Sequence, residues 1–578
     1  MMTTDARRGI TLLAALLFTL SSPAVAVDLI FSGGPILTIN AAQPSAEAVA
    51  VADGRIVAVG NHDEVMALAS ANTRHIDLAG ATLMPGFIEG HGHFLGFGEA
   101  LMTLDLSGHT RFEQTVAAVA AAAAEAAPGE WITGRGWHQE RWQDADEGWV
   151  EGVPTHHALS AVSPDNPVML VHASGHALVA NAQAMAAAGI DANSPDPEGG
   201  VIIRDAAGQP TGFMRQAAQW PIRRALSQTR GALSREQHQA RFERQVELAG
   251  AEALRHGVTS FHDQGSSLDE VAALVALADA GRLPIRLHLA LRGHDNDTLR
   301  AQLAAERRIG HADHFLTVRA IKVQIDGALG THGAWLLEPY ADRPDTAGLP
   351  QVALDTLRET AALALEHGYQ LNVHAIGDRG NREALNLYQA FLTGSDGDNG
   401  DEDRRDLRWR IEHAQNLHPD EVPRFAELGV TASMQGIHAT SDGPWVPQRL
   451  GQARAQQRAY VWRALLDADA LICNGTDVPV EPISPLASLQ ASITRRMANG
   501  EVFFAEQAMQ REQALYSYTL GCAKAVFEEG LLGSIEVGKL ADLVVLSDNP
   551  LLVPADQIAD IEVIMTLLAG EVRFQREH

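Results

Sequence analysis

Eight short apolar runs recur along this 578-residue chain, and they constrain its fold more than any other feature. Helix-like stretches rich in Ala and Leu separate most of them, for example residues 355–367 and 377–392. Strands that are buried on both faces and alternate with helices are typical of parallel sheets. Eight such repeats predict an α/β fold, a (β/α)₈ TIM barrel. The runs are residues 82–88, 257–263, 285–291, 317–325, 370–376, 408–414, 429–434 and 470–476.

Side chains that can bind a metal ion lie at the ends of five of these runs. His91 and His93 follow the first run, and two residues spaced in this way on an extended segment point in the same direction. The active site of such a barrel lies at the carboxyl ends of its strands, so these side chains are expected to meet there. Together they form a nitrogen- and oxygen-rich set that suits Zn²⁺ or a similar divalent ion. The other members of the set are Lys322, His374, His413 and Asp477.

The two ends of the chain share a texture of short strand-like pieces. Turn signals such as Asp53-Gly54 separate them near the N-terminus, and similar pieces recur after Gly533. Neither end has enough strands to form a stable sheet alone. We therefore predict one small β-sandwich domain built from residues 27–81 and 530–578, with the barrel formed by residues 82–529.

The spacing between the first and second runs is much longer than one crossover helix needs. Residues 98–245 are therefore predicted to form an inserted subdomain. Because this segment leaves the barrel mouth just after His93, we expect it to cover the site. Within it, Trp137 and His176 are candidates for the wall of a substrate pocket.

The N-terminus has the pattern of a secretory signal peptide. Arg7-Arg8 precede an apolar run, and Ala24-Val25-Ala26 is a small-residue cleavage site. We expect residues 1–26 to be removed and the mature protein to be exported, periplasmic or secreted. An uncleaved membrane anchor is the alternative. No later segment has the roughly 18 uninterrupted apolar residues that a spanning helix requires.

The net charge of −28 argues against nucleic acid or an anionic membrane surface as a partner. A small-molecule substrate is the expected partner, and the sequence does not decide whether the protein forms a homo-oligomer. The chain has two cysteines, which an exported protein could pair. However, Cys473 lies inside an apolar run and Cys522 in a helix-like stretch, so we interpret them as two buried thiols.

Several motifs of the chain resemble one known group of enzymes. They are Pro85-Gly-Phe-Ile-Glu-Gly-His-Gly-His93, Asn372-Val-His-Ala-Ile-Gly-Asp378, Arg410-Ile-Glu-His-Ala-Gln415, Gly475-Thr-Asp-Val-Pro479 and Gly533-Ser-Ile-Glu-Val-Gly-Lys-Leu-Ala-Asp-Leu543. This set resembles the amidohydrolase superfamily, in particular its amidohydrolase 3 (YtcJ-like) branch, which includes N-substituted formamide deformylase. The resemblance covers nearly all of the chain beyond the signal-like segment.

The resemblance implies a role for each candidate ligand. His91 and His93 would hold a first metal ion together with Asp477, and His374 and His413 would hold a second, both ions being Zn²⁺. Lys322 would be carboxylated on its amine and bridge the two, because a carbamate is an anionic oxygen ligand whereas an ammonium cannot bind a cation. The alternative is an unmodified Lys322 that binds substrate or pairs with Asp326, beside a single metal ion.

The implied reaction is hydrolysis of a carbon–nitrogen bond in an amide, N-formyl or N-acyl amine by a metal-activated water. Asp477 would move the proton. Asp326 and His438 are further candidates for the substrate pocket. The chain departs from its relatives at Gly136-Trp-His-Gln139 and Ser174-Gly-His176, where they read Gly-Trp-Asp-Gln and often Asp-Gly-His, so no relative's substrate can be carried over. The competing interpretations are a one-metal deaminase of a ring amidine and a non-catalytic regulatory or binding protein.

Overall fold

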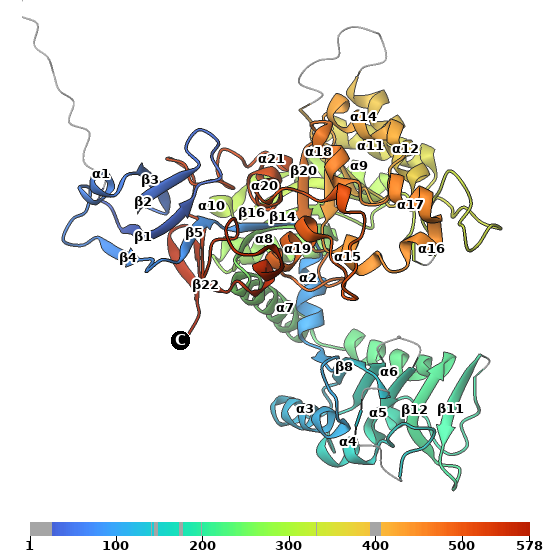
Figure 1. Ribbon diagram of the computed structural model, residues 1–578. Helices are drawn as coiled ribbons and strands as arrows, with labels where there is room; N and C mark the ends of the chain where they lie inside the picture. The colour runs from blue at the N-terminus through green and yellow to red at the C-terminus, as the bar shows by residue number, and fades with distance from the viewer. Residues whose placement is uncertain are drawn as a thin grey trace, which may run out of the picture.

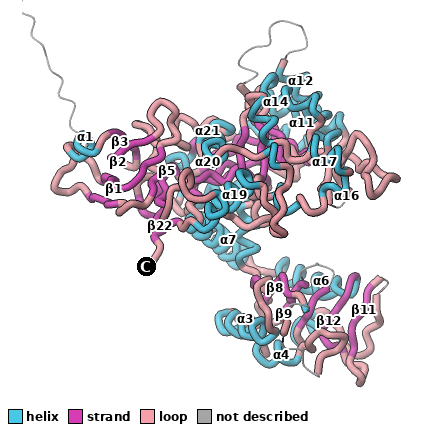
Figure 2. Tube along the Cα trace, in the orientation of Figure 1, coloured by secondary structure: helices cyan, strands magenta, loops and turns pink. Residues whose placement is uncertain are grey.

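The computed structural model describes residues 26–139, 142–143, 148–172, 177–197, 199–330, 332–393 and 406–577. Its three parts are a central barrel, a sheet built from both ends of the chain, and an inserted subdomain that stands apart below the barrel (Figure 1). Figure 2 shows helices packed around the barrel strands. Within the described ranges, no helix is long and apolar enough to cross a membrane.

The barrel sheet has eight parallel strands in the described ranges, and each pairs with the next along the chain. The short strand β15 (Arg308–Gly310) adds an antiparallel pairing to β16. The predicted TIM barrel is confirmed. Its strands are β6 (Phe87–Gly92), β13 (Val258–Ser266), β14 (Arg286–Leu291), β16 (Leu316–Gln324), β17 (Gln370–Ala375), β18 (Arg410–His413), β19 (Thr431–Gln435) and β20 (Ile472–Gly475).

Helices follow the strands and bury their apolar faces against them. Capping residues fix several starts; Ser267, for example, accepts a hydrogen bond from the Glu270 backbone at the start of α8. The helices after β6 and β13 to β17 are α2 (Phe94–Leu101), α7 (Arg235–Arg255), α8 (Leu268–Asp279), α9 (Asn296–Glu306), α10 (His311–His314), α11 (Leu354–His367) and α12 (Asp378–Leu392). Those after β18 and β19 are α14 (Val422–Leu428), α15 (His438–Asp442), α16 (Val446–Leu450), α17 (Gln452–Arg458) and α18 (Trp462–Asp467). After β20 come α19 (Pro485–Thr494), α20 (Arg511–Ser517) and α21 (Leu520–Ala525).

The first and last barrel strands meet through a buried carboxyl group and a few backbone hydrogen bonds. Glu89 on β6 is fully buried and accepts hydrogen bonds from the Thr476 backbone and hydroxyl, at 2.6 and 3.1 Å. The Asp477 N–H donates to the His91 carbonyl at 2.7 Å, and the His93 N–H donates to Val478 at 2.8 Å. These bonds hold the two metal-candidate segments, 91–93 and 477, side by side.

The first predicted run contains two strands instead of one. β5 (Thr82–Pro85) pairs with β1 and β21 of the end sheet, and only β6 enters the barrel. Gly86 separates them, since a Cβ there would lie 2.4 Å from the Thr259 side chain. A glycine is needed where the chain leaves one sheet and enters the other against a neighbouring strand. The predicted boundary at residue 81 therefore falls before the last N-terminal strand of the end sheet.

The two chain ends form one continuous eight-stranded sheet in the described ranges, not two separate sheets. One face packs around Phe31, Val49, Leu83 and Leu543, which are all buried. The small helix α1 (His62–Met66) lies by the sheet's opposite face with Val65. The strands are β1 (Leu29–Leu37), β2 (Ser45–Ala52), β3 (Arg55–Gly60), β4 (Arg74–Asp77), β5, β21 (Leu543–Leu546), β22 (Val563–Leu568) and β23 (Glu571–Gln575).

The inserted subdomain has its own six-stranded sheet and its own cores. It is joined to the barrel through α2 and α7, which pack together. Helix α7 runs past the predicted end of the insertion at residue 245 and packs on β13. The strands are β7 (Leu104–Asp105), β8 (Ile132–Trp137), β9 (Val168–His172), β10 (Ala177–Ala180), β11 (Gly200–Arg204) and β12 (Pro210–Gln216), with helices α3 (Phe112–Glu125), α4 (His157–Val162), α5 (Ala182–Ala187) and α6 (Trp220–Gly231).

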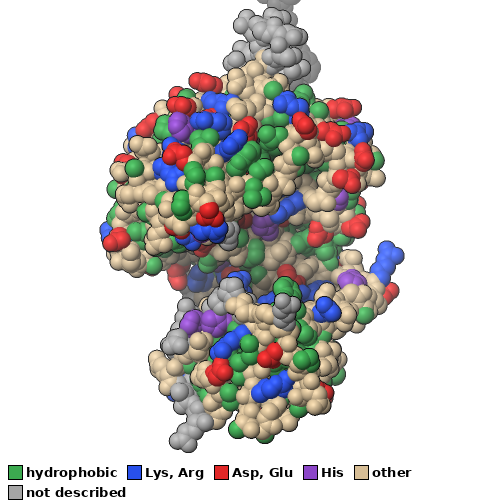
Figure 3. Space-filling model, turned by 90° about the vertical axis from the view of Figure 1, so that its right-hand side faces the viewer, with side chains coloured by type: hydrophobic (Ala, Val, Ile, Leu, Met, Phe, Trp, Pro, Cys, Tyr) green, Lys and Arg blue, Asp and Glu red, His purple; other side chains and the backbone are tan. Residues whose placement is uncertain are grey.

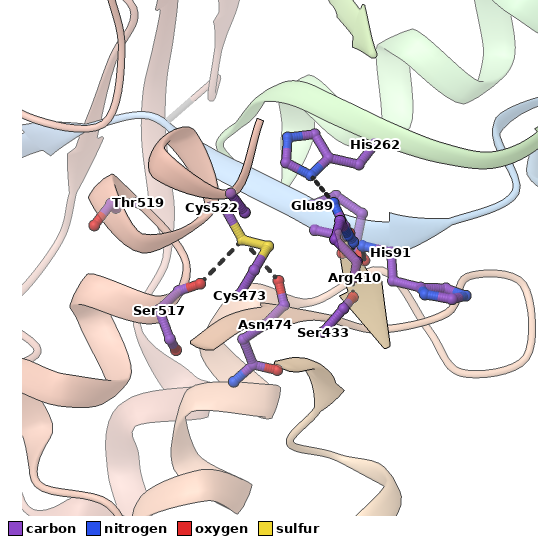
Figure 4. The surroundings of a disulfide bond; sticks show 12 residues. Glu89, His91, His262, Arg410, Ser433, Cys473, Asn474, Ser517, Thr519 and Cys522 are labelled. Atoms are coloured by element: carbon purple, nitrogen blue, oxygen red, sulfur yellow. Dashed lines mark hydrogen bonds between the residues drawn. A yellow bond between two sulfur atoms is a disulfide. The ribbon is translucent and has the colours of Figure 1, made fainter. Parts of the chain in front are cut away.

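Cys473 and Cys522 form a disulfide, so the interpretation as two buried thiols is wrong (Figure 4). Both residues are buried as expected, but β20 and α21 bring their Cα atoms to 4.5 Å, which is within bonding range. The bond packs on β6 at Gly90, where a Cβ would lie 2.3 Å from Cys473 Sγ. The His91 ring points away from it in Figure 4. The disulfide therefore supports the strands of the site without entering it.

Candidate metal centre

The barrel brings all six candidate ligands to one end of its sheet. His91, Lys322, His374 and His413 lie in the last three residues of their strands. His93 follows β6 directly, and Asp477 lies two residues beyond β20. The His413 ring centroid is 4.6 Å from that of His91 and 4.5 Å from that of His374. Residues far apart in sequence thus form one compact cluster at the barrel mouth.

His91 is oriented by a carboxylate on a neighbouring strand. Its Nδ1 lies 2.5 Å from Glu412 Oε2, and both side chains are buried. Burial and the nearby Lys322 lower the pKa of His91 to about 4, so the ring is neutral at pH 7. A neutral ring that donates through Nδ1 carries its lone pair on Nε2, the usual arrangement of a metal-binding histidine. Within the described residues, this Nε2 has no hydrogen-bond partner.

Glu412 is itself held in its charged form. Arg410 Nε donates to its Oε1 at 2.7 Å, and both side chains are fully buried. Although burial raises it, the pKa of Glu412 stays well below its ordinary value because Arg410 and His91 stabilise the carboxylate. Arg410 also donates to Ser433 and faces His262, as Figure 4 shows. The buried Arg410–Glu412 ion pair therefore fixes the orientation of His91.

His413 and His374 complete the ring cluster. His413 Nδ1 lies 2.7 Å from Gln435 Oε1 and must donate to it, which leaves the lone pair on Nε2. Burial lowers the pKa of both histidines well below 6.5. The neighbouring His374 lowers the pKa of His413 further, and Lys322 does the same for His374. In the part of the chain that the structure describes, His374 Nε2 has no hydrogen-bond partner. Both rings are neutral donors of electron pairs.

Asp477 faces the two histidines of β6. Its Oδ1 lies 3.3 Å from His93 Nε2 and 3.5 Å from His91 Nε2. Burial raises the pKa of Asp477, but His91 and His93 outweigh it and keep the group ionised. Asp477 and His413 both have positive φ, 58° and 75°, which is strained for residues with a side chain. Such strain occurs where surrounding structure fixes a functional geometry.

Lys322 is buried among these groups and makes no ion pair within the described ranges. Glu412 and Asp477, which favour its charged form, pair instead with Arg410 and with the histidines. Burial lowers the pKa of Lys322 to about 8. A measurable fraction of the amine is therefore uncharged at neutral pH and able to react as a nucleophile.

The donor set fits a divalent metal ion. Ligand atoms of His91, His413 and Asp477 all lie within 4.8 Å of one another. Among the described residues, His91 Nε2 and His374 Nε2 have no hydrogen-bond partner, and a buried polar atom in this state is costly without a ligand. Neutral imidazoles with a carboxylate are ligands that Zn²⁺ and similar ions accept. These three closest ligands come from both predicted sets, so the structure forms one cluster and not two separate sites.

The substrate-pocket candidates have different placements. Asp326 is fully buried and accepts backbone hydrogen bonds from Trp335, Ile376 and Gly377 at 2.8–3.0 Å, so it fixes the loops beside His374. Its pKa is raised to about 7 by burial. It makes no ion pair with Lys322 among the described residues. Asp326 as a pocket residue stays a prediction: its oxygens accept from the backbone, and its Oδ1 also lies 3.7 Å from Nε2 of the candidate ligand His374.

His438 and Trp137 also differ from each other. His438, at the start of α15, stacks 6.4 Å from His413 and has no partner for Nε2 in the described ranges. Trp137 is buried in the core of the inserted subdomain, stacked 5.2 Å from Trp142, and donates to the Leu170 carbonyl. Trp137 is therefore a packing residue and not part of a pocket wall. The pattern of apolar residues in the sequence could not distinguish these two roles. His176 lies outside the described residues.

The sequence did not single out the residues that orient the ligands. Glu412, Gln435 and Arg410 contact the ligand histidines or one another. Arg410 and Glu412 are two residues apart on β18 and so share its inner face, which is a weak signal for a paired charge inside the barrel. Nothing in the sequence indicates that Glu412 meets His91, because the two are separated by 321 residues.

A hollow separates the barrel from the inserted subdomain, with histidine side chains on the barrel side (Figure 3). At the rim, a cavity of about 440 Å³ extends past Lys322 and Gln324 to the loop that follows β14. Of the six candidate ligands, Lys322 alone lines this cavity, whose other walls come from the loop after β14 and from α9 and α11. The arrangement offers ligands for a metal ion and an ionised carboxylate.

Comparisons with known proteins find a family whose model spans most of the chain. The amidohydrolase family model (Amidohydro_3) matches residues 74–574. The Bacillus subtilis (strain 168) protein "Putative amidohydrolase YtcJ" is 31% identical over 95% of this chain and 99% of its own. N-substituted formamide deformylase of Arthrobacter pascens is 27% identical over 95% and 98%. The crystal structure of an uncharacterized metal-dependent hydrolase from Pyrococcus furiosus has a TM-score of 0.70 and 27% identity, covering 90% of this chain and 99% of that one.

Proposed function

Because the chain belongs to the amidohydrolase family, we propose that it is a metal-dependent hydrolase of carbon–nitrogen bonds in amides, N-formyl amines or N-acyl amines. The observation that carries the proposal is the buried cluster of His91, His413 and Asp477, whose ligand atoms lie within 4.8 Å of one another, with no hydrogen-bond partner for His91 Nε2 among the described residues. A relative named N-substituted formamide deformylase supports the choice of an N-formyl or N-acyl bond.

Two Zn²⁺ ions are proposed as the cofactor. His91, His93 and Asp477 would hold one, and His374 and His413 the other, with a carboxylated Lys322 between them. Lys322, Lys524 and Lys539 are the only lysines in a chain with 44 basic residues. A buried lysine where arginine is the usual cation favours a role that needs a reactive amine. Its lowered pKa and the absence of an ion partner among the described residues support carbamate formation.

A divalent ion held there supplies Lewis acidity that polarises a carbonyl and makes water nucleophilic near neutral pH. Asp477 stays ionised and can accept the proton of that water and return it to the leaving amine. Gln415 Nε2 lies 3.3 Å from His438 Nδ1 and can only donate, so the His438 proton is on Nε2. That N–H is a suitable donor to the carbonyl oxygen as negative charge develops on it.

Metal analysis combined with a substrate screen tests the proposal. Protein made with ample zinc should hold about two equivalents, as a bridged pair requires, and should release formate or a short acid from N-formyl or N-acyl amines. Lys322→Ala and Lys322→Arg should each lose at least one equivalent, since neither side chain can form a carbamate. Lys539→Ala is the control, because this buried lysine pairs with Glu536 in the end sheet.

Two results would contradict it. Full metal content and activity in Lys322→Ala would remove the bridge and favour a one-metal site. Ammonia release from ring amidines, with no hydrolysis of acyl amines, would establish a deaminase instead.

We also propose that the protein is exported with cleavage after Ala26. Residues 1–25 lie outside the described range, so support comes from the Arg7-Arg8 and Ala24-Val25-Ala26 pattern and from the disulfide, which forms in oxidising compartments. N-terminal sequencing of protein from the periplasm or medium should begin at Val27. A cytosolic protein beginning at Met1 would overturn this.

A further inference from the structure

Arg292 lies at the barrel mouth beside the metal centre. It directly follows β14, and its N–H continues the strand pairing by donating to the Ser266 carbonyl at 3.0 Å. Leu291 is in register with Ile321, so the next position along places Arg292 beside Lys322. Neighbouring residues in register on parallel strands face the same side of a sheet. Arg292 therefore faces the interior of the mouth, as Lys322 does.

The Arg292 guanidinium is a cation without a counterion. Its side chain donates to the neutral Gln324 Oε1 at 3.3 Å, and in the described part of the chain no carboxylate forms an ion pair with it. It is close enough to Lys322 and His374 to disfavour their charged forms. This cation adds positive charge beside the site, and no acid pairs with it in the described part of the chain. It is therefore suited to bind an anionic group of a ligand.

The acids near Arg292 are engaged elsewhere. Asp295, Asp297 and Glu359 line the same cavity. Asp295 accepts from the Thr298 backbone at the start of α9, while Asp297 and Glu359 both pair with Arg300. Arg300 is thus a neutralised arginine only eight positions away, which makes it a matched control for Arg292.

A glycine opposite Arg292 provides room for its side chain. A Cβ at Gly265, on the adjacent β13, would lie 2.5 Å from Arg292 Cδ and 3.2 Å from its Cβ. Any larger residue there would push the arginine stem away. The packing therefore holds the guanidinium at the mouth while leaving its donors open.

We propose that Arg292 and Gln324 form a carboxylate-binding subsite, and that the substrate is an N-formyl or N-acyl amine bearing one carboxylate. The inference rests on the proposed function and adds its substrate class. One planar guanidinium next to one amide matches a planar carboxylate, which it can bind through two parallel hydrogen bonds. A dianionic phosphate fits less well, because a single cation would face two negative charges in a cavity that also contains three acids.

The test measures binding without turnover. The Asp477→Asn protein, loaded with zinc, is titrated calorimetrically with N-formylalanine and with the neutral N-formylalaninamide, which differ in the charge under study. The carboxylate ligand should bind about 10- to 100-fold more tightly, as expected for a hydrogen-bonded charge pair. Adding Arg292→Met should bring that ratio close to one, Arg292→Lys should keep part of it, and Arg300→Met should leave it unchanged.

Each outcome is decisive. A preference that survives Arg292→Met would come from the metal ions and overturn the subsite, as would equal binding of the two ligands. Equal loss of both ligands together with metal would assign Arg292 to the support of Lys322 and also overturn it. If the preference depends on Arg292 but the active enzyme hydrolyses neither compound, the subsite stands and the proposed reaction fails.

Discussion

The two ends of the barrel treat buried charge in opposite ways. At the amino ends of the strands, Arg286 binds Asp542 of the end sheet through two hydrogen bonds of 2.6 and 3.0 Å, with both side chains almost fully buried. At the carboxyl ends, His91 and His374 keep polar atoms without hydrogen-bond partners in the described ranges. Paired charges join parts of a fold, whereas unpaired polar atoms that converge indicate a missing ligand. In such barrels, the active site lies at the carboxyl ends of the strands.

The sharpest test of this difference is made at the mouth. Asp477→Asn preserves shape and one oxygen but removes the base, so kcat should fall by about 10²–10⁴-fold, the usual contribution of a general base. Much of the metal should remain, because the histidines are intact. His91→Ala should lose activity and metal together. Asp477→Asn should unfold at nearly the wild-type denaturant concentration, whereas His91→Ala also takes away the buried partner of Glu412 and should be less stable. Near-normal turnover in Asp477→Asn would transfer the proton step to another group, with His438 the first to examine.

At the other end the expected effects are reversed. Asp542→Asn leaves Arg286 buried without its counterion, and breaking such a pair costs about 3–5 kcal/mol in the free energy of unfolding. Metal content and kcat of the folded protein should not change. Asp297→Asn, which removes the charge of an exposed pair with Arg300, should leave the denaturation midpoint nearly unchanged. If Asp542→Asn altered metal binding while stability stayed constant, the separation between the two ends would not hold.

The sequence could predict the mouth better than the opposite end. Ligand types and strand ends are local features of the sequence. The order of the apolar runs was therefore enough to predict that His91, His374, His413 and Asp477 lie together. The Arg286–Asp542 pair joins residues 256 positions apart, and neither lies in a pattern that indicates its partner.

The same limit applies to Trp137 and Asp326. A tryptophan on a strand can line a cavity or pack in a core, and only the fold of the inserted subdomain, with Trp142 against its ring, decides. Asp326 follows a strand as a ligand does, and the sequence could not show that its oxygens accept from backbone N–H groups of two loops. The chemical type of each side chain was predictable from the sequence, but the groups that it hydrogen-bonds to or packs against were not.

Between the two ends lies a layer of buried histidines, which allows a smaller test. His288 on β14 is buried 5.4 Å from His262, and burial together with Arg410 and Arg319 lowers its pKa to about 3. In the unfolded chain its pKa is near 6.5, so unfolding takes up a proton at lower pH. The stability that His288 contributes is therefore complete above pH 6.5 and is lost as the pH falls toward 3.

His288→Gln should reduce this acid sensitivity. Removing one such group lowers the slope of unfolding free energy against pH by about 1.4 kcal/mol per pH unit between roughly pH 6 and 4. Urea denaturation across that range measures it, with His62→Gln as the control because His62 is exposed at the start of α1. An unchanged slope in His288→Gln would mean that the acid sensitivity arises elsewhere. Since neither Arg286 nor the metal ligands are altered, kcat at pH 7 should stay constant, which separates this middle layer from both ends of the barrel.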